Sequence, residues 1–205
     1  LINEKIRGWR FFSNLFFIPT TMAVAITGIL WRRIYDPING PLNELGRKIG
    51  WQALARAEWL YAPNLALPSV LLAGFWRWIG FTMVIFLAGL QSINPDYYDA
   101  AEVDGASWWR RLWHITIPLL KPTFAFNFIW IWSHAMRIFD IIWVMTAAEF
   151  GPRETTSVLT TWLFVQGFRF SNFGYGCAVA TVLLLITFIV AIIQLRMFKL
   201  KEVSF

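Results

Sequence analysis

The sequence predicts an all-α membrane protein, a polytopic bundle of membrane-spanning helices, and three observations lead to that fold class. Hydrophobic residues make up 58% of the 205 residues and charged residues only 15%, against roughly 45–50% and 25% in a typical soluble domain. The chain contains 13 Trp and 19 Phe, more aromatic surface than a soluble domain of this length can cover. Long stretches without a charged residue recur along it. We therefore expect residues 1–205 to form one transmembrane domain.

Two segments have the length and composition of a spanning helix without any charge. A helix needs about 20 predominantly apolar residues to cross the hydrocarbon core of a bilayer. Phe11 to Trp31 comprises 21 uncharged residues, and Phe170 to Leu195 comprises 26. Each predicts one span.

Two further spans contain charged residues. Segment 59–95 carries Arg77 alone, and Pro68 near its start and the Asn94-Pro95 pair at its end favour a helix between about 68 and 90. A last candidate begins at Pro122. The four expected spans are 11–33, 68–90, 121–146 and 174–196.

Four spans place both ends of the chain on one side of the membrane. Leaving out Arg77 and Arg137, the side of the chain ends and of the loop 91–121 has nine Lys and Arg (5, 7, 10, 110, 111, 121, 196, 199, 201), and the other side has seven (32, 33, 47, 48, 56, 153, 169). This excess favours cytoplasmic chain ends. Segment 35–67 is compatible both with a short interfacial helix at about 45–60 and with an ordered loop.

The loop between the second and third spans, about 91–120, is patterned as helix, turn and helix. Asn94-Pro95-Asp96 is a helix start with acidic residues in the first turns. Ala100 and Ala101 leave a bare patch that another surface can approach. Gly105 then interrupts the helix before the aromatic and basic segment 108–113. A loop of this length and pattern is more than a connector, and it predicts a docking surface.

These loop residues resemble the EAA loop of ABC importer permeases. The family pattern is Glu-Ala-Ala, three residues, Gly, nine residues and Ile-x-Leu-Pro. The chain has Asp99-Ala100-Ala101, then Gly105, then Ile115-Thr116-Ile117-Pro118. Asp99 stands where the family has Glu, and Ile117 where it has Leu, and both changes are mild.

The flanks resemble carbohydrate-uptake permeases of the maltose and glycerol-3-phosphate type. The matching segments are Leu87–Ile93, Phe139–Ile142, Val144–Thr146 and Phe173–Gly176. After Thr146 the family usually has Gly-Gly-Pro, whereas this chain has Ala147-Ala148-Glu149-Phe150-Gly151-Pro152. This departure leaves the local shape of the external loop open.

The resemblance implies a multi-pass permease subunit of the prokaryotic cytoplasmic (inner) membrane that imports a sugar or oligosaccharide. It implies about six spans, two of them before Leu1, so that the chain is expected to supply the later four. It also implies a second permease subunit, two cytoplasmic ATPase subunits and an extracytoplasmic sugar-binding protein as partners. The loop 91–121 would be cytoplasmic. Its expected ATPase-coupling residues are Asp99, Ala100, Ala101, Glu102 and Gly105.

The sequence shows no chemistry of its own. It lacks G-x-x-x-x-G-K-[ST], so ATP and Mg²⁺ are expected on the partner ATPase and not on this chain. The single Cys177 and the two His residues, His114 and His134, give no disulfide, no metal centre and no catalytic set. The net charge of +6 is scattered, which argues against nucleic acid. No catalytic, cofactor-binding or metal residue is expected.

Charged residues inside the expected spans indicate a hydrated path. Each costs at least about 2.5–3.5 kcal/mol in hydrocarbon. On the third span, polar and aromatic residues from Asn127 to Arg137 step by three, four and three along one helical face, and Arg137 and Asp140 are spaced for an ion pair. A purely structural pair is the alternative. The candidate path residues are Arg77, Trp78, Phe81, Asn127, Trp130, His134, Arg137 and Asp140.

Two other functions remain open. The two intramembrane arginines are compatible with a permease for a phosphorylated polyol or another small solute. A membrane scaffold or sensor that transports nothing is disfavoured, because it has no use for an ATPase-docking loop.

Overall fold

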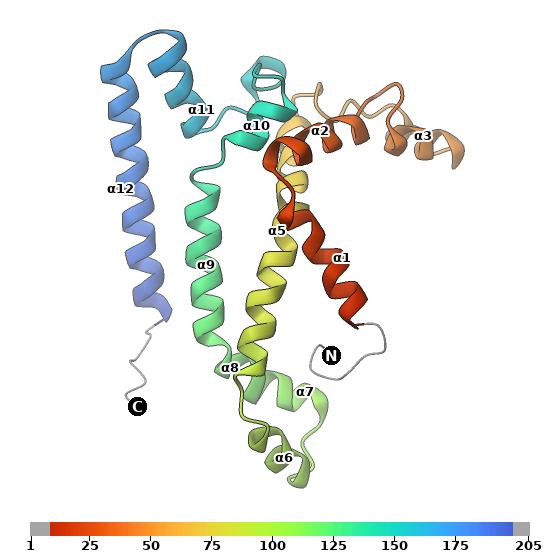
Figure 1. Ribbon diagram of the computed structural model, residues 1–205, viewed down its shortest axis with the longest axis vertical. Coiled ribbons are helices and arrows are strands. Elements are labelled where there is room, and N and C mark those ends of the chain that lie inside the picture. The colour runs from red at the N-terminus through yellow and green to blue at the C-terminus, as the bar shows by residue number, and fades with distance from the viewer. Residues whose placement is uncertain (1–8, 199–205) are drawn as a thin grey trace.

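The protein was described from a computed structural model, which gives the backbone of residues 9–198 and the side chains of residues 14–198. These residues form helices and no strands (Figure 1). The all-α prediction is therefore confirmed for the described part of the chain.

Four helices run along the long axis of the molecule (Figure 1). They are α1 (Trp9–Thr21), α5 (Ala66–Gln91), α9 (Lys121–Ala135) and α12 (Phe173–Phe198). One end carries α2 (Val24–Ile34), α3 (Pro41–Lys48), α4 (Gln52–Ala55), α10 (Asp140–Met145), η2 (Pro152–Glu154), α11 (Leu159–Phe164) and η3 (Val165–Arg169). The other end carries α6 (Asp96–Val103), α7 (Trp108–Arg111), η1 (Leu112–Thr116) and α8 (Ile117–Leu119). Following the topology expected from the sequence, we name the α6–α7 end cytoplasmic and the opposite end outer.

The second and fourth expected spans coincide with α5 and α12. Each has 26 residues and is apolar enough to cross a membrane, and at 1.5 Å per residue each is about 39 Å long. Most of the surface of α12 is exposed in this chain. Exposure of an apolar helix is no defect here, because lipid tails are as apolar as its side chains.

The expected span over 11–33 is not one continuous helix. The chain turns by 109° between α1 and α2, and Ala23 at the turn has extended backbone angles (φ −60°, ψ 143°). Pro19 lies inside the last turn of α1, where it lacks the N–H that an unbroken helix needs. The free backbone groups at the turn find partners on α5, as described below, and these partners could not be foreseen from a charge-free run.

The expected span over 121–146 is also interrupted. α9 ends at Ala135, and Phe139 has non-helical angles (φ −143°, ψ −56°) before α10 begins at Asp140. An acidic residue in a first turn favours the start of a new helix. The Thr160 hydroxyl donates a hydrogen bond to the Ile138 carbonyl, which the break leaves free. At its cytoplasmic end, α9 is bent by 62° from the helical stretch 108–119.

Segment 35–67 contains two short helices, so neither a single helix over 45–60 nor a plain loop describes it. Asn43 on α3 organises the segment from a fully buried position. Its amide nitrogen donates to the carbonyls of Ala55 (3.3 Å) and Ala57 (2.8 Å), and its amide oxygen accepts the Trp59 indole N–H at 2.7 Å. One buried amide therefore holds α3 and α4 against the following turn.

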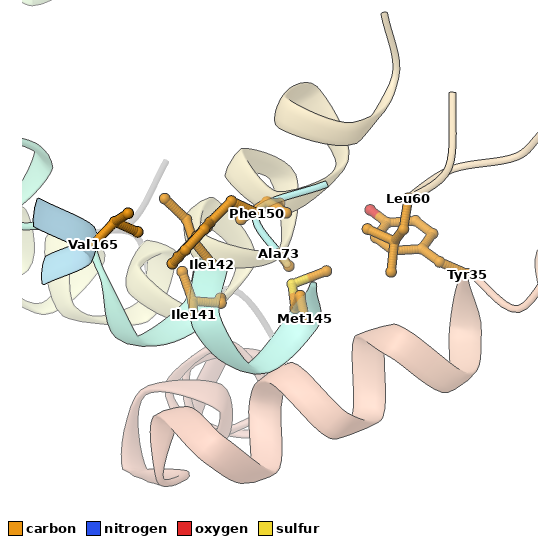
Figure 2. Close-up of a cluster of buried hydrophobic side chains, with 9 residues drawn as sticks. Tyr35, Leu60, Ala73, Ile141, Ile142, Met145, Phe150 and Val165 are labelled. Carbon is orange, nitrogen blue, oxygen red and sulfur yellow. The ribbon is translucent and has the colours of Figure 1, made fainter. Parts of the chain in front are cut away.

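The apolar core lies at the outer end of the bundle (Figure 2). It joins α5, α10 and η3 with the residue that follows α2, the turn that precedes α5 and the turn that follows α10. The buried members are Tyr35, Leu60, Val70, Ala73, Ile141, Ile142, Met145, Phe150 and Val165. Packing of this kind fixes α10, and with it the outer end of the space between α5 and α9.

Candidate functional sites

A cavity of about 430 Å³ lies between α5 and α9, towards the outer end. We refer to it as the α5–α9 cavity. Gly74 and Trp78 of α5, Trp130 and His134 of α9, and the first residue of α10, Asp140, line it together with other, mostly apolar, residues. Its size and its mixture of aromatic and few polar side chains are typical of a small-molecule site.

Aromatic side chains of α5 and α9 contact one another beside this cavity. The Trp78 ring lies 4.9 Å from Trp130 and 4.5 Å from His134, and the Phe81 ring lies 4.4 Å from Trp130, all between ring centroids. Four of the eight residues that the sequence suggested therefore form one aromatic cluster, and three others, Arg77, Arg137 and Asp140, line the cavity beside it. Phe81 itself contacts Trp130 and does not line the cavity.

Arg77 lines the cavity and also holds the turn between α1 and α2. Its Nε and Nη2 donate to the Met22 carbonyl at 3.3 and 3.2 Å, and the Thr20 hydroxyl donates to the Arg77 carbonyl at 2.8 Å. The guanidinium carbon lies 4.4 Å from the centroid of the Trp78 ring. The break between α1 and α2 leaves the Met22 carbonyl without a hydrogen-bond donor from its own helix. Arg77 supplies donors to this carbonyl instead.

Arg137 and Asp140 both line the cavity, but the ion pair considered for them is not formed. Among residues 14–198 the only ion pairs are Lys48–Glu44 and Arg111–Glu102. The spacing of three supports a pair only on a continuous helix, and the chain is non-helical at Phe139 between the two residues. The Arg137 Nε donates instead to the Ser133 carbonyl at 3.1 Å.

Asn127 lies away from the cavity. It is buried on α9, where its amide nitrogen donates to the Thr123 carbonyl at 3.0 Å and its amide oxygen has no partner within the described residues. The expectation that it lines the path together with His134 is therefore not met in this structure.

On the cytoplasmic side of the cavity α5 and α9 are in close contact. Phe86 and Phe124 meet at 4.9 Å between ring centroids. A Cβ at Gly89 would lie only 2.3 Å from the Thr123 hydroxyl and 3.0 Å from Leu120. Between these two helices, the cavity is thus closed towards the cytoplasmic end.

The α6–α7 loop has the helix, turn and helix that the sequence indicated. Gly105 has a left-handed φ of +69°, and the Ala106 N–H donates to the Ala101 carbonyl at 2.9 Å, which is a common way to end a helix. The hydroxyls of Tyr98 and Thr116 are hydrogen-bonded at 3.0 Å, and Arg111 pairs with Glu102 at 3.3 Å. These contacts tie α6 to the helix that follows.

The exposed face of α6 differs in part from the one we expected. Ala101 is buried against its own chain, with 7% of its surface exposed, so in this structure its side chain is not open to another surface. Asp99, Ala100 and Glu102 are exposed, and Val103 is 89% exposed. Val103 was not among the expected residues, although an apolar residue two positions before the helix-ending Gly105 in a polar loop is a detectable sign of a contact surface.

The outer turn where the chain departs from Gly-Gly-Pro keeps a strained backbone. Ala147 (φ +52°), Ala148 (φ +67°) and Phe150 (φ +58°) take left-handed angles that glycine adopts more easily. Arg169 stabilises the turn, since its Nη2 donates to the Ala148 carbonyl at 2.7 Å and its guanidinium lies 5.4 Å from the Phe150 ring centroid. The substitution therefore leaves left-handed backbone at two of the positions where the family usually has glycine.

Comparison with known sequences then decides the family. The sequence model of the binding-protein-dependent transport system inner membrane component matches residues 7–199. The chain belongs to this family.

Individual members of the family, and a solved structure, are similar over most of this chain. A probable ABC transporter permease protein of Pyrococcus horikoshii is 36% identical over 193 residues, which are 94% of this chain and 65% of that protein. The xylose/arabinose import permease protein XacH of Haloferax volcanii is 32% identical over 185 residues, 90% of this chain and 57% of that protein.

The fold is similar to that of a bacterial ABC transporter involved in the import of the acidic polysaccharide alginate. The TM-score is 0.85 at 23% identity, over 100% of this chain and 70% of the solved one. This inner membrane component thus shares its fold with a solved importer, and it spans less than two thirds of the length of the two relatives named above.

Proposed function

We propose that this inner membrane component is a permease subunit of an ATP-driven, binding-protein-dependent importer of a sugar or oligosaccharide. The observation that carries the proposal is the α5–α9 cavity. It combines aromatic faces with a few polar side chains, whereas membrane-spanning helices built only for stability would have apolar packing between them.

The lining of the cavity suits a sugar. Aromatic rings such as those of Trp78 and Trp130 stack on the C–H faces of a sugar ring, and His134, Arg137 and Asp140 offer donors and acceptors to hydroxyl groups. No bond in the solute needs to break, so recognition is the only chemistry required. Binding has to be weak enough for release, which a few hydrogen bonds and one stacking surface provide. The relative XacH, named for xylose and arabinose import, agrees with this class.

Transport would be driven by partner subunits. We propose that two cytoplasmic ATPases bind ATP and Mg²⁺, that α6 docks on one of them, and that this chain hydrolyses nothing. A second permease would complete the path, and an extracytoplasmic binding protein would deliver the sugar at the outer end. The permease would alternate between a state open to the outer side and a state open to the cytoplasm. ATP binding shifts the populations of these two states only to the extent that the ATP-bound ATPases bind one state better than the other.

A phosphorylated polyol has less support than a sugar. Arg77 is one of the two arginines that line the cavity, and two of its N–H groups are already donated to the Met22 carbonyl. Arg137 remains, but Asp140 lines the same cavity. The negative charge of Asp140 would repel a phosphate group.

The test is uptake by cells that lack the gene and carry the full-length protein or a variant. Labelled pentoses, neutral oligosaccharides, acidic sugars and a phosphorylated polyol are offered in turn. We expect the deletion to abolish uptake of at least one sugar, and Trp130→Ala and His134→Ala to reduce that uptake tenfold or more. Trp51→Ala is the matched control, because Trp51 is 59% exposed and lies outside the cavity.

Two results would contradict the proposal. One is a deletion strain that takes up every sugar normally and loses only the phosphorylated polyol. The other is parent-level uptake, with unchanged preference, in both cavity variants.

A further inference from the structure

A second cavity, of about 350 Å³, lies at the outer end, between the C-terminal turn of α2 and the residues around Leu60. It is separate from the α5–α9 cavity, and the proposed transport mechanism does not use it. Arg32 and Arg33 of α2 line it, together with Ile29, Asp36 and Tyr61. Apolar and cationic groups thus face the same space.

The charges of this cavity do not cancel. Asp36 accepts the backbone N–H groups of Asn39 at 2.8 Å and Ile38 at 2.9 Å, and these hydrogen bonds, with a smaller effect of Arg33, lower the pKa of its carboxyl group. It is therefore ionised at neutral pH. Arg32 and Arg33 have neither an ion pair nor a side-chain hydrogen bond among residues 14–198. One positive charge remains, and so do the donors of both guanidinium groups.

The apolar side of α2 leads into the same cavity. Ile26 and Ile29 are 56% and 58% exposed, and Leu30 is 39% exposed. The spacing of Ile26, Ile29 and Arg33 places them on one face of the helix. Because α2 is turned by 109° from α1, this face runs across the direction of the spans (Figure 1).

Aromatic side chains lie beside this helix and pack on one another. Trp31 lies 5.1 Å from Tyr35 and 5.6 Å from Trp76, and Tyr35 lies 5.5 Å from Trp59, between ring centroids. Trp and Tyr concentrate where hydrocarbon meets water. A helix at that depth with one apolar face and terminal arginines has the features of an interfacial helix.

We propose that this cavity binds the headgroup of an anionic phospholipid of the outer leaflet. Arg32 and Arg33 hold the phosphate, since the guanidinium fork matches its oxygens. Tyr61, which is 57% exposed, offers a hydroxyl beside them. The start of an acyl chain lies along Ile29 and Ile26. The bound lipid fixes α2 at the membrane surface, and the proposal stands independently of which solute is transported.

The experiment titrates the purified, delipidated full-length protein with short-chain phosphatidylglycerol, and counts bound lipids by native mass spectrometry. We expect Arg32→Gln with Arg33→Gln to weaken phosphatidylglycerol binding at least tenfold, and Arg32→Lys with Arg33→Lys to weaken it less. Arg56→Gln is the control, because it removes one positive charge from an exposed position outside the cavity, and its binding should equal the parent's. Phosphatidylcholine should bind more weakly than phosphatidylglycerol, since the site has a net positive charge.

Four outcomes would overturn the proposal. The first is phosphatidylglycerol binding to the double Gln variant that is as tight as binding to the parent, in protein that elutes as a single species. The second is a loss of binding in the control Arg56→Gln as large as that in the double variant. The third is displacement of the lipid by millimolar inorganic phosphate, which would identify a site for a small anion. The fourth is a double variant that keeps its lipid and loses solute uptake, which would identify a protein partner on this face.

Discussion

Replacing Arg77 by Met separates a structural role of this residue from a role in solute binding. The change removes two N–H groups that reach the Met22 carbonyl at 3.2 and 3.3 Å, and a guanidinium 4.4 Å from the Trp78 ring centroid. A hydrogen bond from a charged donor contributes about 1.5–3 kcal/mol, and a cation–π contact about 0.5–2 kcal/mol. Because both hydrogen bonds share one acceptor and Arg77 is partly exposed, we expect a total loss of about 2–4 kcal/mol.

The assay is the unfolding free energy of the detergent-purified full-length protein, measured beside the KM for uptake. Arg77→Lys keeps the charge without the fork and should lose about half as much stability. Arg137→Met is the matched control, since the one hydrogen bond of Arg137 stays within its own chain segment, and it should cost less than about 1 kcal/mol. An Arg77→Met variant that unfolds like the parent and has a tenfold higher KM would contradict the structural role of Arg77, because Arg77 would then contact the solute and leave the turn to other groups.

Two further predictions concern helix contact and coupling. A Cβ at Gly80 would lie 2.2 Å from the Phe16 carbonyl oxygen, whereas one at Gly74 meets no atom within 4 Å. Gly80→Ala should therefore destabilise the folded protein by about 1–3 kcal/mol. Gly74→Ala on the same helix is the control and should be neutral or slightly stabilising. Equal melting temperatures of the two variants would contradict this packing of α1 on α5. Val103→Asp, at an 89% exposed position, should leave the protein folded and lower sugar-stimulated ATP hydrolysis at least tenfold; unchanged stimulation would remove Val103 from the docking surface.

The features that depend on local pattern were predictable from the sequence. The apolar length of α5 and α12 and the helix-ending role of Gly105 follow from residues close in the chain. The contact of Trp78 and Phe81 with Trp130 and His134 also followed, because helical spacing selects one face.

The features that depend on distant partners were not. The turn after Met22 is stabilised by Arg77, 55 residues away, and a charge-free run gives no indication of it. The break before Asp140 similarly depends on Thr160 of α11. It also removed the ion pair and the continuous stripe that assumed an unbroken helix. Burial of Ala101 depends on how α6 folds against its own chain, which the loop pattern leaves undetermined.

Solute protection of a single cysteine in the α5–α9 cavity tests the central claim most directly. Cys177 is the only cysteine among residues 1–205, so Cys177→Ala, with any cysteines elsewhere in the transporter replaced as well, gives a background without thiols. Gly74→Cys places a thiol in the cavity where a Cβ has open space, and Gly174→Cys, with equally open space on α12 outside the cavity, is the control. In the assembled transporter, a membrane-impermeant maleimide should label position 74, and the transported sugar should slow that reaction at least fivefold without affecting position 174. Labelling of position 74 at the same rate with and without the sugar would contradict the assignment of this cavity to the solute.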